Sequence, residues 1–166
     1  MNLHSLDPSK SIILDANILL YGIQRKSKQC VELISRIGDG ELNCHITSHI
    51  LAEVMHVLMI EEARSIGEIT GGNPARKLSE KPGLVNSLYL YESVFEDILN
   101  LGMNIEVVEK QDLIEALAVQ RKYGLLTNDS LIIAVAKRLR ITSLVSADKV
   151  FAKVRSITLY SPDDII

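Results

Sequence analysis

The sequence of 166 residues predicts an α/β fold with a mainly parallel central sheet and helices on both of its faces. Short apolar runs that do not alternate with polar residues, such as residues 11–14, are typical of strands buried on both faces. Longer segments with helical spacing of apolar residues, such as 27–37, lie between these runs. Strands that alternate with helices favour a parallel sheet, and this length fits a single domain spanning residues 1–166.

The expected elements follow one another without an internal repeat. We expect strands at residues 11–14, 42–46, 105–108, 143–146 and 156–160, and helices at residues 27–37, 49–63, 84–101, 112–123 and 129–139. Thr47 or Ser48 is expected to cap the second helix, and Asp112 with Glu115 to form a capping box at the fourth. The polar, glycine-containing segment 65–83 predicts a long loop or insertion with room for a short helical piece.

Composition excludes several classes of protein. Hydrophobic residues make up 47% of the chain, which is enough for a core without disulfide bonds. The net charge of −3 argues mildly against a general nucleic-acid binder, which is usually basic. Cys30 and Cys44 lack the spacing of a zinc or redox pair, so we expect buried, reduced thiols. Neither a signal-peptide pattern nor a membrane-length apolar run occurs, so we expect a cytoplasmic protein.

Two aspartates follow predicted strands at the same edge of the expected sheet. Asp15 comes directly after the strand at 11–14, and Asp148 follows the strand at 143–146. Ligands of open α/β sheets bind beyond the carboxyl ends of the strands, so these two acids are candidates for a shared site. Each aspartate alone is equally compatible with a turn or a helix cap.

Two further acids lie on predicted helices. Glu53 shares a helix face with apolar Ile50, Val57 and Ile60, where a carboxylate is costly to desolvate unless it is paired or binds a metal. A glutamate at the rim that reaches solvent is the alternative. Asp129 stands in the first turn of a strongly apolar helix, where an acid offsets the helix dipole and is held rigidly enough to bind a metal.

Acids brought together in this way imply a cation. Carboxylates within a few ångströms repel one another, and a metal ion neutralises them. Oxygen ligands favour Mg²⁺ or Mn²⁺ over zinc. Such a metal lowers the pKa of a bound water and stabilises charge on phosphate oxygens, which suits phosphodiester hydrolysis.

Four segments of the chain resemble the PIN-domain family, which includes the VapC toxins of prokaryotic toxin–antitoxin pairs. These segments are ILDANILLYG, SHILAEVMHVL, YGLLTNDSLIIAVAKRLRITSLVSADKVFAKV and ITLYSP, and they cover nearly the whole chain in the family's order. The resemblance implies a three-layer α/β/α fold, Mg²⁺ or Mn²⁺ as cofactor, cleavage of RNA and frequent homodimers. An antitoxin protein is a further partner that the resemblance implies.

The resemblance also implies roles for individual residues. By position, Asp15, Glu53, Asp129 and Asp148 match the family's catalytic, metal-binding acids. Asn17, two residues after the first acid, looks like a polar helper. Ser146, two residues before the last acid, looks like a residue that orients a ligand or water.

Two other functions remain open at this point. A PIN-like module could act mainly by binding RNA or protein, although it would have little need for all four acids. A phosphotransferase or phosphatase could use Asp15 as nucleophile, but such phosphatases usually carry a second acid where this chain has Asn17. Substitution of Asp15 by Asn is expected to abolish cleavage and to leave the fold intact or slightly stabilised, because it relieves repulsion among the acids.

The remaining expectations concern the surface. The segment 65–83 is longer than compact toxins of this kind usually need, so the partner surface is expected to differ. Binding of RNA by a mildly acidic chain is expected to depend on local basic patches such as Lys149, Lys153 and Arg155. We expect the tail aspartates, Asp163 and Asp164, to be solvated.

Overall fold

The computed structural model describes all residues from Met1 to Ile166, and the chain divides into two compact units. The first unit comprises Met1–Leu51 and Leu101–Ile166. The second comprises Ala52–Asn100. The single domain expected over residues 1–166 stays a prediction.

A five-stranded sheet forms the centre of the first unit, and all of its strands run parallel. The strand order is β3-β2-β1-β4-β5. The strands are β1 (Ile12–Leu14), β2 (Cys44–Thr47), β3 (Asn104–Glu106), β4 (Ser143–Val145) and β5 (Thr158–Tyr160). Leu14, the last residue of β1, is in register with Ile46 of β2 and with Val145 of β4. The predicted parallel sheet is confirmed.

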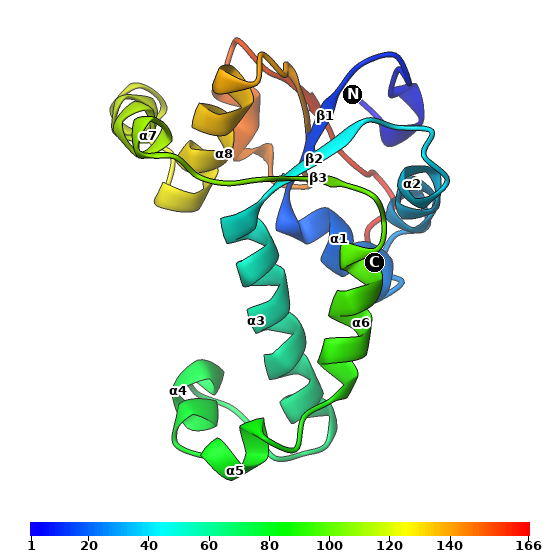
Figure 1. The fold of residues 1–166 in the computed structure, drawn as a ribbon, viewed down its shortest axis with the longest axis vertical. Helices are drawn as coiled ribbons and strands as arrows, with labels where there is room; N and C mark the ends of the chain where they lie inside the picture. Colours follow the sequence, from blue (N-terminus) through cyan, green and yellow to red (C-terminus); the bar gives the residue numbers. More distant parts are fainter. The chain divides into compact units, whose positions relative to one another are not determined.

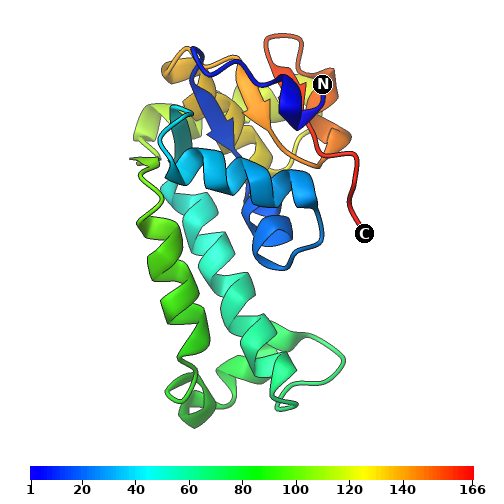
Figure 2. The same cartoon turned by 90° about the vertical axis from the view of Figure 1, so that its right-hand side faces the viewer.

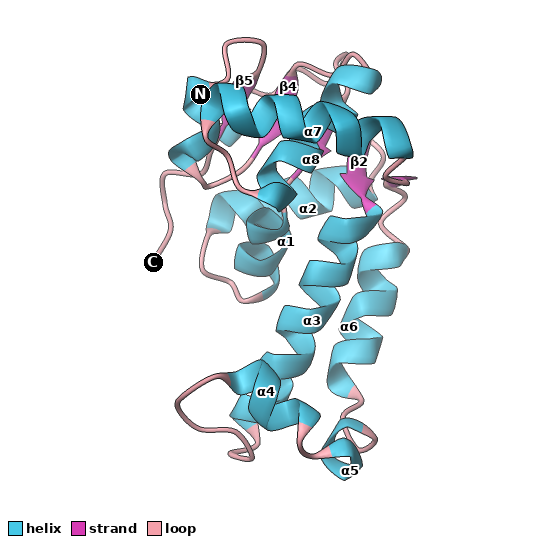
Figure 3. Cartoon of the chain, turned by 90° about the vertical axis from the view of Figure 1, so that its left-hand side faces the viewer, coloured by secondary structure: helices cyan, strands magenta, loops and turns pink.

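Helices cover both faces of this sheet. They are α1 (Ala16–Ile23), α2 (Lys28–Gly38), α7 (Lys110–Tyr123) and α8 (Thr127–Arg138), with the 3-10 helices η1 (Leu3–Ser5) and η2 (Lys149–Lys153). The pair α1 and α2 lies on one face, and the pair α7 and α8 on the other (Figures 1, 2 and 3). The three-layer α/β/α fold is therefore confirmed. None of the helices has the length and apolar character that crossing a bilayer requires.

The apolar runs of the sequence lie where their pattern predicts. All three residues of β1 and all three of β4 are buried, as expected for strands covered on both faces. Residues 130–136 of α8 are also buried without a break. Cys30 and Cys44 are buried free thiols, and burial raises the pKa of the Cys44 thiol to about 12, so this thiol stays protonated.

The order of the strands creates a switch point between β1 and β4. From β1 the chain passes through α1 and α2 to β2 and then outward to β3. It returns through α7 and α8 to β4, on the other side of β1, and continues outward to β5. Crossovers on opposite faces leave a crevice beyond the carboxyl ends of the two central strands, which is where ligands of such sheets bind.

Helix α1 was not expected from the sequence. Four of its eight residues are buried, at Ala16, Ile18, Leu19 and Gly22, and its sequence, ANILLYGI, is almost wholly apolar. It therefore lacks the polar face that marks a surface helix. Gly22 lets α1 approach α2 closely, since a Cβ there would lie 2.3 Å from the Ile34 side chain.

The second unit consists mainly of helices. They are α3 (Ser48–Ser65, which begins in the first unit), α4 (Pro74–Ser79), α5 (Pro82–Val85) and α6 (Leu90–Leu99). Its core is a cluster of five buried apolar residues, Ile60, Ala63, Ile69, Leu78 and Leu88. The short helix expected within residues 65–83 is present as α4, and Asn73 caps it.

The helix expected at residues 84–101 begins later, at Leu90. The carboxylate of Glu62 in α3 explains this start. It accepts hydrogen bonds from the backbone N–H groups of Tyr89, Leu90 and Tyr91, at 3.0, 3.1 and 2.8 Å. These are donors that the first turn of α6 leaves without partners inside the helix. Glu62 therefore caps α6 from a neighbouring helix.

The expected capping box of α7 was wrong, and of the two residues expected to cap α3, Thr47 or Ser48, Thr47 is excluded. Helix α7 begins at Lys110, and its capping box joins Glu109 with Asp112 rather than Asp112 with Glu115. Asp112 is nearly fully buried and also accepts two hydrogen bonds from Nε of Arg138. The hydroxyl of Thr47 is buried and has no hydrogen-bond partner, so it does not cap α3.

The tail aspartates were expected to be solvated. Asp163 is exposed as expected, but both aspartates are hydrogen-bonded to other segments. Asp164 accepts hydrogen bonds from the hydroxyl of Ser27 and, at 3.1 Å, from the backbone N–H of Gln29. Asp163 accepts hydrogen bonds from the side-chain amides of Asn2 and Gln29. Residues separated by more than 130 positions meet here, which no local pattern in the sequence indicates.

Candidate active site

Asp15 stands at the switch point, between the end of β1 and the start of α1. Its side chain caps α1, because Oδ1 accepts a 2.8 Å hydrogen bond from the backbone N–H of Ala16. Only 8% of Asp15 is exposed. A buried carboxylate needs hydrogen-bond donors around it, and this local fold supplies the first of them.

The other oxygen of Asp15 joins the two central strand ends. Oδ2 accepts hydrogen bonds of 2.6 Å from both the Asn17 amide and the Ser146 hydroxyl. The carbonyl oxygen of the Asn17 side chain accepts a 2.9 Å bond from the backbone N–H of Ala147. Asn17 and Ser146 thus hold the carboxylate in one orientation and tie α1 to the loop after β4.

Ser146 connects Asp15 to Asp148. Its hydroxyl donates to Asp15 and accepts hydrogen bonds from the backbone N–H of Asp148, at 2.9 Å, and from the Asn17 amide, at 3.2 Å. Ser146 is fully buried, whereas Asp148 is exposed and caps η2 through a 2.8 Å bond from the N–H of Val150. The structure therefore brings Asp15, Asn17, Ser146 and Asp148 into one network.

The other two predicted acids are not shown in this network. Asp129 is half-buried in the first turn of α8, beside Ser130, whose buried hydroxyl has no hydrogen-bond partner. Glu53 is half-buried in α3 and belongs to the second unit. Neither unit by itself gathers three or more Asp, Glu, His or Cys side chains in a group that could hold a metal ion.

The chemistry of the donors fits a hard divalent cation. Asp15 and Asp148 offer carboxylate oxygens, and no thiol or imidazole belongs to their network. Proteins usually hold Mg²⁺ through one or two carboxylates, with water and substrate phosphates completing the coordination. Asp15 and Asp148 are of the ligand type that this mode of binding uses, although Asp148 joins the network through its backbone N–H and its carboxylate caps η2.

The comparison that decides the family covers most of the chain and four of the five strands. The model of the PIN domain matches residues 12–157, from the start of β1 to the residue before β5. The chain belongs to the PIN domain family. PIN domains are generally nucleases, and Asp15, Asn17, Ser146 and Asp148 all lie within the matched residues.

Solved structures share the fold of this PIN domain at low sequence identity. VapBC2 from Rickettsia felis, bound to a DNA fragment from its promoter, is 17% identical with a TM-score of 0.58, covering 92% of this chain and 99% of that chain. PAE2754 from Pyrobaculum aerophilum is 18% identical with a TM-score of 0.57, covering 92% and 84%.

A third similar structure is a toxin–antitoxin complex from Klebsiella pneumoniae. It is 19% identical with a TM-score of 0.51, and the match covers 89% of this chain and 95% of that chain. Likeness at these identities shows the fold alone. Among curated proteins, none matches the sequence.

Proposed function

We propose that this PIN domain is an endoribonuclease that depends on Mg²⁺ or Mn²⁺. The observation that carries the proposal is the hydrogen-bonded carboxylate of Asp15 at the switch point, held by Asn17 and Ser146. An acid fixed at the ligand-binding edge of a parallel sheet is suited to a positively charged cofactor. Membership in a family of nucleases makes a phosphodiester the substrate that fits it best.

The proposed metal ligands are the four acids Asp15, Glu53, Asp129 and Asp148. Asp15 and Asp148 enter the proposal from the network, whereas Glu53 and Asp129 enter it from the sequence. When bound, the metal lowers the pKa of a water molecule and stabilises negative charge on the phosphate. Asn17 and Ser146 orient the Asp15 carboxylate, so that its oxygens need no rearrangement when the cation and substrate arrive.

We also propose that the protein is the toxin of a toxin–antitoxin pair, with an antitoxin protein as partner, a homodimeric assembly and a cytoplasmic location. Two structures that share the fold come from toxin–antitoxin complexes, which supports this assignment. A gene for a small DNA-binding protein directly upstream is the expected companion. A processing enzyme that acts alone would lack such a neighbour.

The proposal is tested by incubating the purified protein with a mixed-sequence RNA. We expect cleavage with Mg²⁺ or Mn²⁺, loss of cleavage with excess EDTA, and recovery when the metal is restored. Equal cleavage in EDTA would contradict the metal dependence. Binding of intact RNA with no cleavage under any metal would favour the module that binds RNA or protein without catalysis.

A further inference from the structure

A second site in the first unit is a pocket of about 670 Å³ with a strongly basic lining. Lys122, Tyr123, Lys153, Arg155 and Ser156 line it, and none of its lining residues is acidic. The expected basic patch contained Lys153 and Arg155, but Lys149 does not line the pocket, and the two residues from α7 were not expected. The volume lies within the range of small-ligand pockets, roughly 300 to 1,000 Å³.

Two segments far apart in the sequence build this pocket. Lys122 and Tyr123 end α7, whereas Lys153 ends η2 and Arg155 follows it. The ammonium group of Lys153 donates a 3.3 Å hydrogen bond to the carbonyl oxygen of Gly124, which joins the two walls. Gly124 has a φ of 59° and ends α7 in the left-handed conformation, so the chain turns sharply at this point.

The charges in the pocket are not neutralised by the protein. The ion pairs of the chain use other cations, and Lys122, Lys153 and Arg155 take part in none of them. Three like charges around one pocket repel one another, and an anion would relieve that repulsion. On a chain with a net charge of −3, this local excess of positive charge marks a place where a polyanion can bind.

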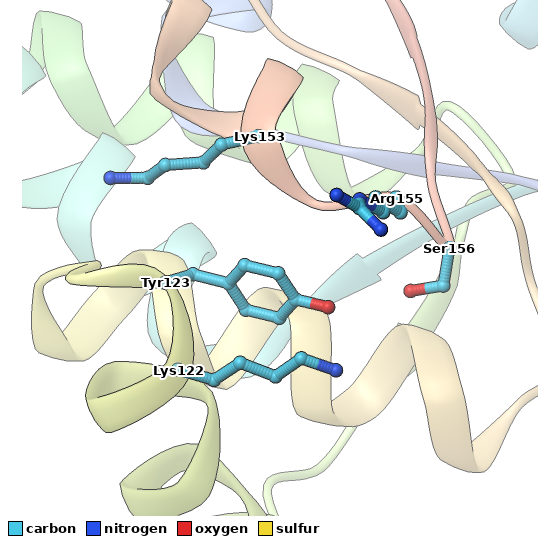
Figure 4. Close-up of a pocket in the computed structure, with 5 residues that line it drawn as sticks. All are labelled: Lys122, Tyr123, Lys153, Arg155 and Ser156. Atoms are coloured by element: carbon cyan, nitrogen blue, oxygen red, sulfur yellow. The ribbon is translucent and has the colours of Figure 1, made fainter.

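Tyr123 adds a flat aromatic surface to this basic site. The ammonium of Lys122 lies 5.0 Å from the centroid of its ring. Figure 4 shows the ring between Lys122 and Lys153, with Arg155 and Ser156 on the side of the tyrosine hydroxyl. Tyr123 is half-buried. Cations combined with an accessible aromatic surface are typical of single-stranded nucleic-acid sites, where cations contact phosphates and bases stack on the ring.

We propose that this pocket binds single-stranded RNA, with the phosphate backbone on Lys153 and Arg155 and one base stacked on Tyr123. The inference rests on the proposed function, because it names an RNA-binding subsite for that enzyme. Asp148 caps the first turn of η2 and Lys153 ends it. Five residues of 3-10 helix span roughly 10 Å, at about 2 Å per residue, so a strand held in the pocket can extend to Asp148.

The test measures RNA binding separately from cleavage. Fluorescence anisotropy of a labelled single-stranded RNA of about ten nucleotides, within the usual site size, is followed in EDTA at several salt concentrations. We expect Lys153→Ala with Arg155→Ala to raise Kd at least about tenfold. The slope of log K against log salt should become shallower by about 1.4, because each phosphate contact contributes about 0.7 for a single strand.

Tyr123 is tested with two variants. Tyr123→Leu should raise Kd by roughly five- to a hundredfold with an unchanged salt slope, because a stacked base is lost and no cation is removed. Tyr123→Phe should bind nearly as well as the native protein, because it keeps the ring. A defect in Tyr123→Phe as large as that in Tyr123→Leu would overturn stacking as the role of this residue.

The matched control is Lys10→Ala with Arg76→Ala, which removes one lysine and one arginine that are exposed elsewhere on the surface. Equal weakening in this control and in the pocket variant would overturn the proposal, because charge alone would then explain binding. The proposal would also be overturned if the pocket variants lost binding of a glutamate-rich peptide but not of RNA. If the protein cleaves RNA but the pocket variant binds RNA as well as the native protein, the pocket proposal fails and the proposed nuclease activity stands. If RNA binding depends on the pocket but no RNA is cleaved, the proposed nuclease activity fails and the pocket proposal stands.

Discussion

The hydroxyl of Ser146 donates a 2.6 Å hydrogen bond to the carboxylate of Asp15, across 131 positions of sequence. The same hydroxyl accepts a bond from the backbone N–H of Asp148. One buried serine thus positions the acid after β1 and the loop that carries the acid after β4. Groups fixed in this way raise catalytic efficiency because they need no reorganisation during the reaction.

Substitution of Ser146 by Ala should slow RNA cleavage by about 10- to 100-fold, the usual effect of removing a group that orients a metal ligand. It should also lower the free energy of unfolding by about 1–3 kcal/mol, since the Asp148 N–H loses its acceptor and Asp15 loses a donor. Cleavage rates and urea unfolding measure the two effects. Ser9→Ala, at an exposed serine, is the control, and an equal effect there would remove the special role of Ser146.

Asp15→Asn should lower the free energy of unfolding by about 1–3 kcal/mol. The hydrogen bonds of Asp15 predict this loss of stability, whereas relief of charge repulsion alone predicted a slight gain. Asp15 accepts bonds from Ala16, Asn17 and Ser146, and an asparagine has only one acceptor oxygen for them. Urea unfolding in EDTA measures the change, with exposed Asp97→Asn as control. An Asp15→Asn protein more stable than the native one would show that repulsion prevails.

Glu62→Gln should destabilise the second unit by about 1 kcal/mol near neutral pH, as loss of an anionic helix cap does. Burial raises the pKa of Glu62, but the N–H groups of Tyr91, Leu90 and Tyr89 lower it more, so its pKa lies below the usual value.

The stability from Glu62 is therefore complete above the unfolded glutamate pKa of about 4.3 and is lost as the pH falls through the lower folded value. Hydrogen exchange of the Tyr91 amide at pH 7 and at a pH well below about 4.3 measures the effect. The difference between native protein and Glu62→Gln should shrink in acid. A difference that grows as the pH falls would contradict the cap.

Asp164→Ala should lower the free energy of unfolding by about 1 kcal/mol, because Asp164 accepts bonds from Ser27 and Gln29 at the start of α2. Thermal unfolding against Asp39→Ala, at an exposed aspartate beyond the other end of α2, measures it. Equal melting temperatures for native and Asp164→Ala protein would mean that the tail contributes no stability.

The strands, and the acids that follow their carboxyl ends, could be predicted because they depend on local pattern. The apolar run before Asp15 indicates a doubly buried strand, and the end of such a strand indicates where a ligand binds. The resemblance to PIN domains implied helper roles for Asn17 and Ser146, and the structure places both against Asp15.

The features that were missed depend on packing between distant segments. The helix expected from Leu84 starts only at Leu90, where the carboxylate of Glu62 accepts hydrogen bonds from the N–H groups of residues 89–91. The expected basic patch supplied one wall of the pocket, at Lys153 and Arg155, but the other wall, at the end of α7, was missed because it is distant in sequence. The buried helix α1 has too few polar residues to show an amphipathic pattern.

The most direct test of the account compares RNA cleavage in Mg²⁺ by the native protein, Asp15→Asn and Asp97→Asn. The account predicts that Asp97→Asn cleaves at the native rate and that Asp15→Asn, shown by circular dichroism to be folded, loses at least about 100-fold in rate, or 2.7 kcal/mol at 1.36 kcal/mol per tenfold. Native cleavage by folded Asp15→Asn would contradict the assignment of the active site.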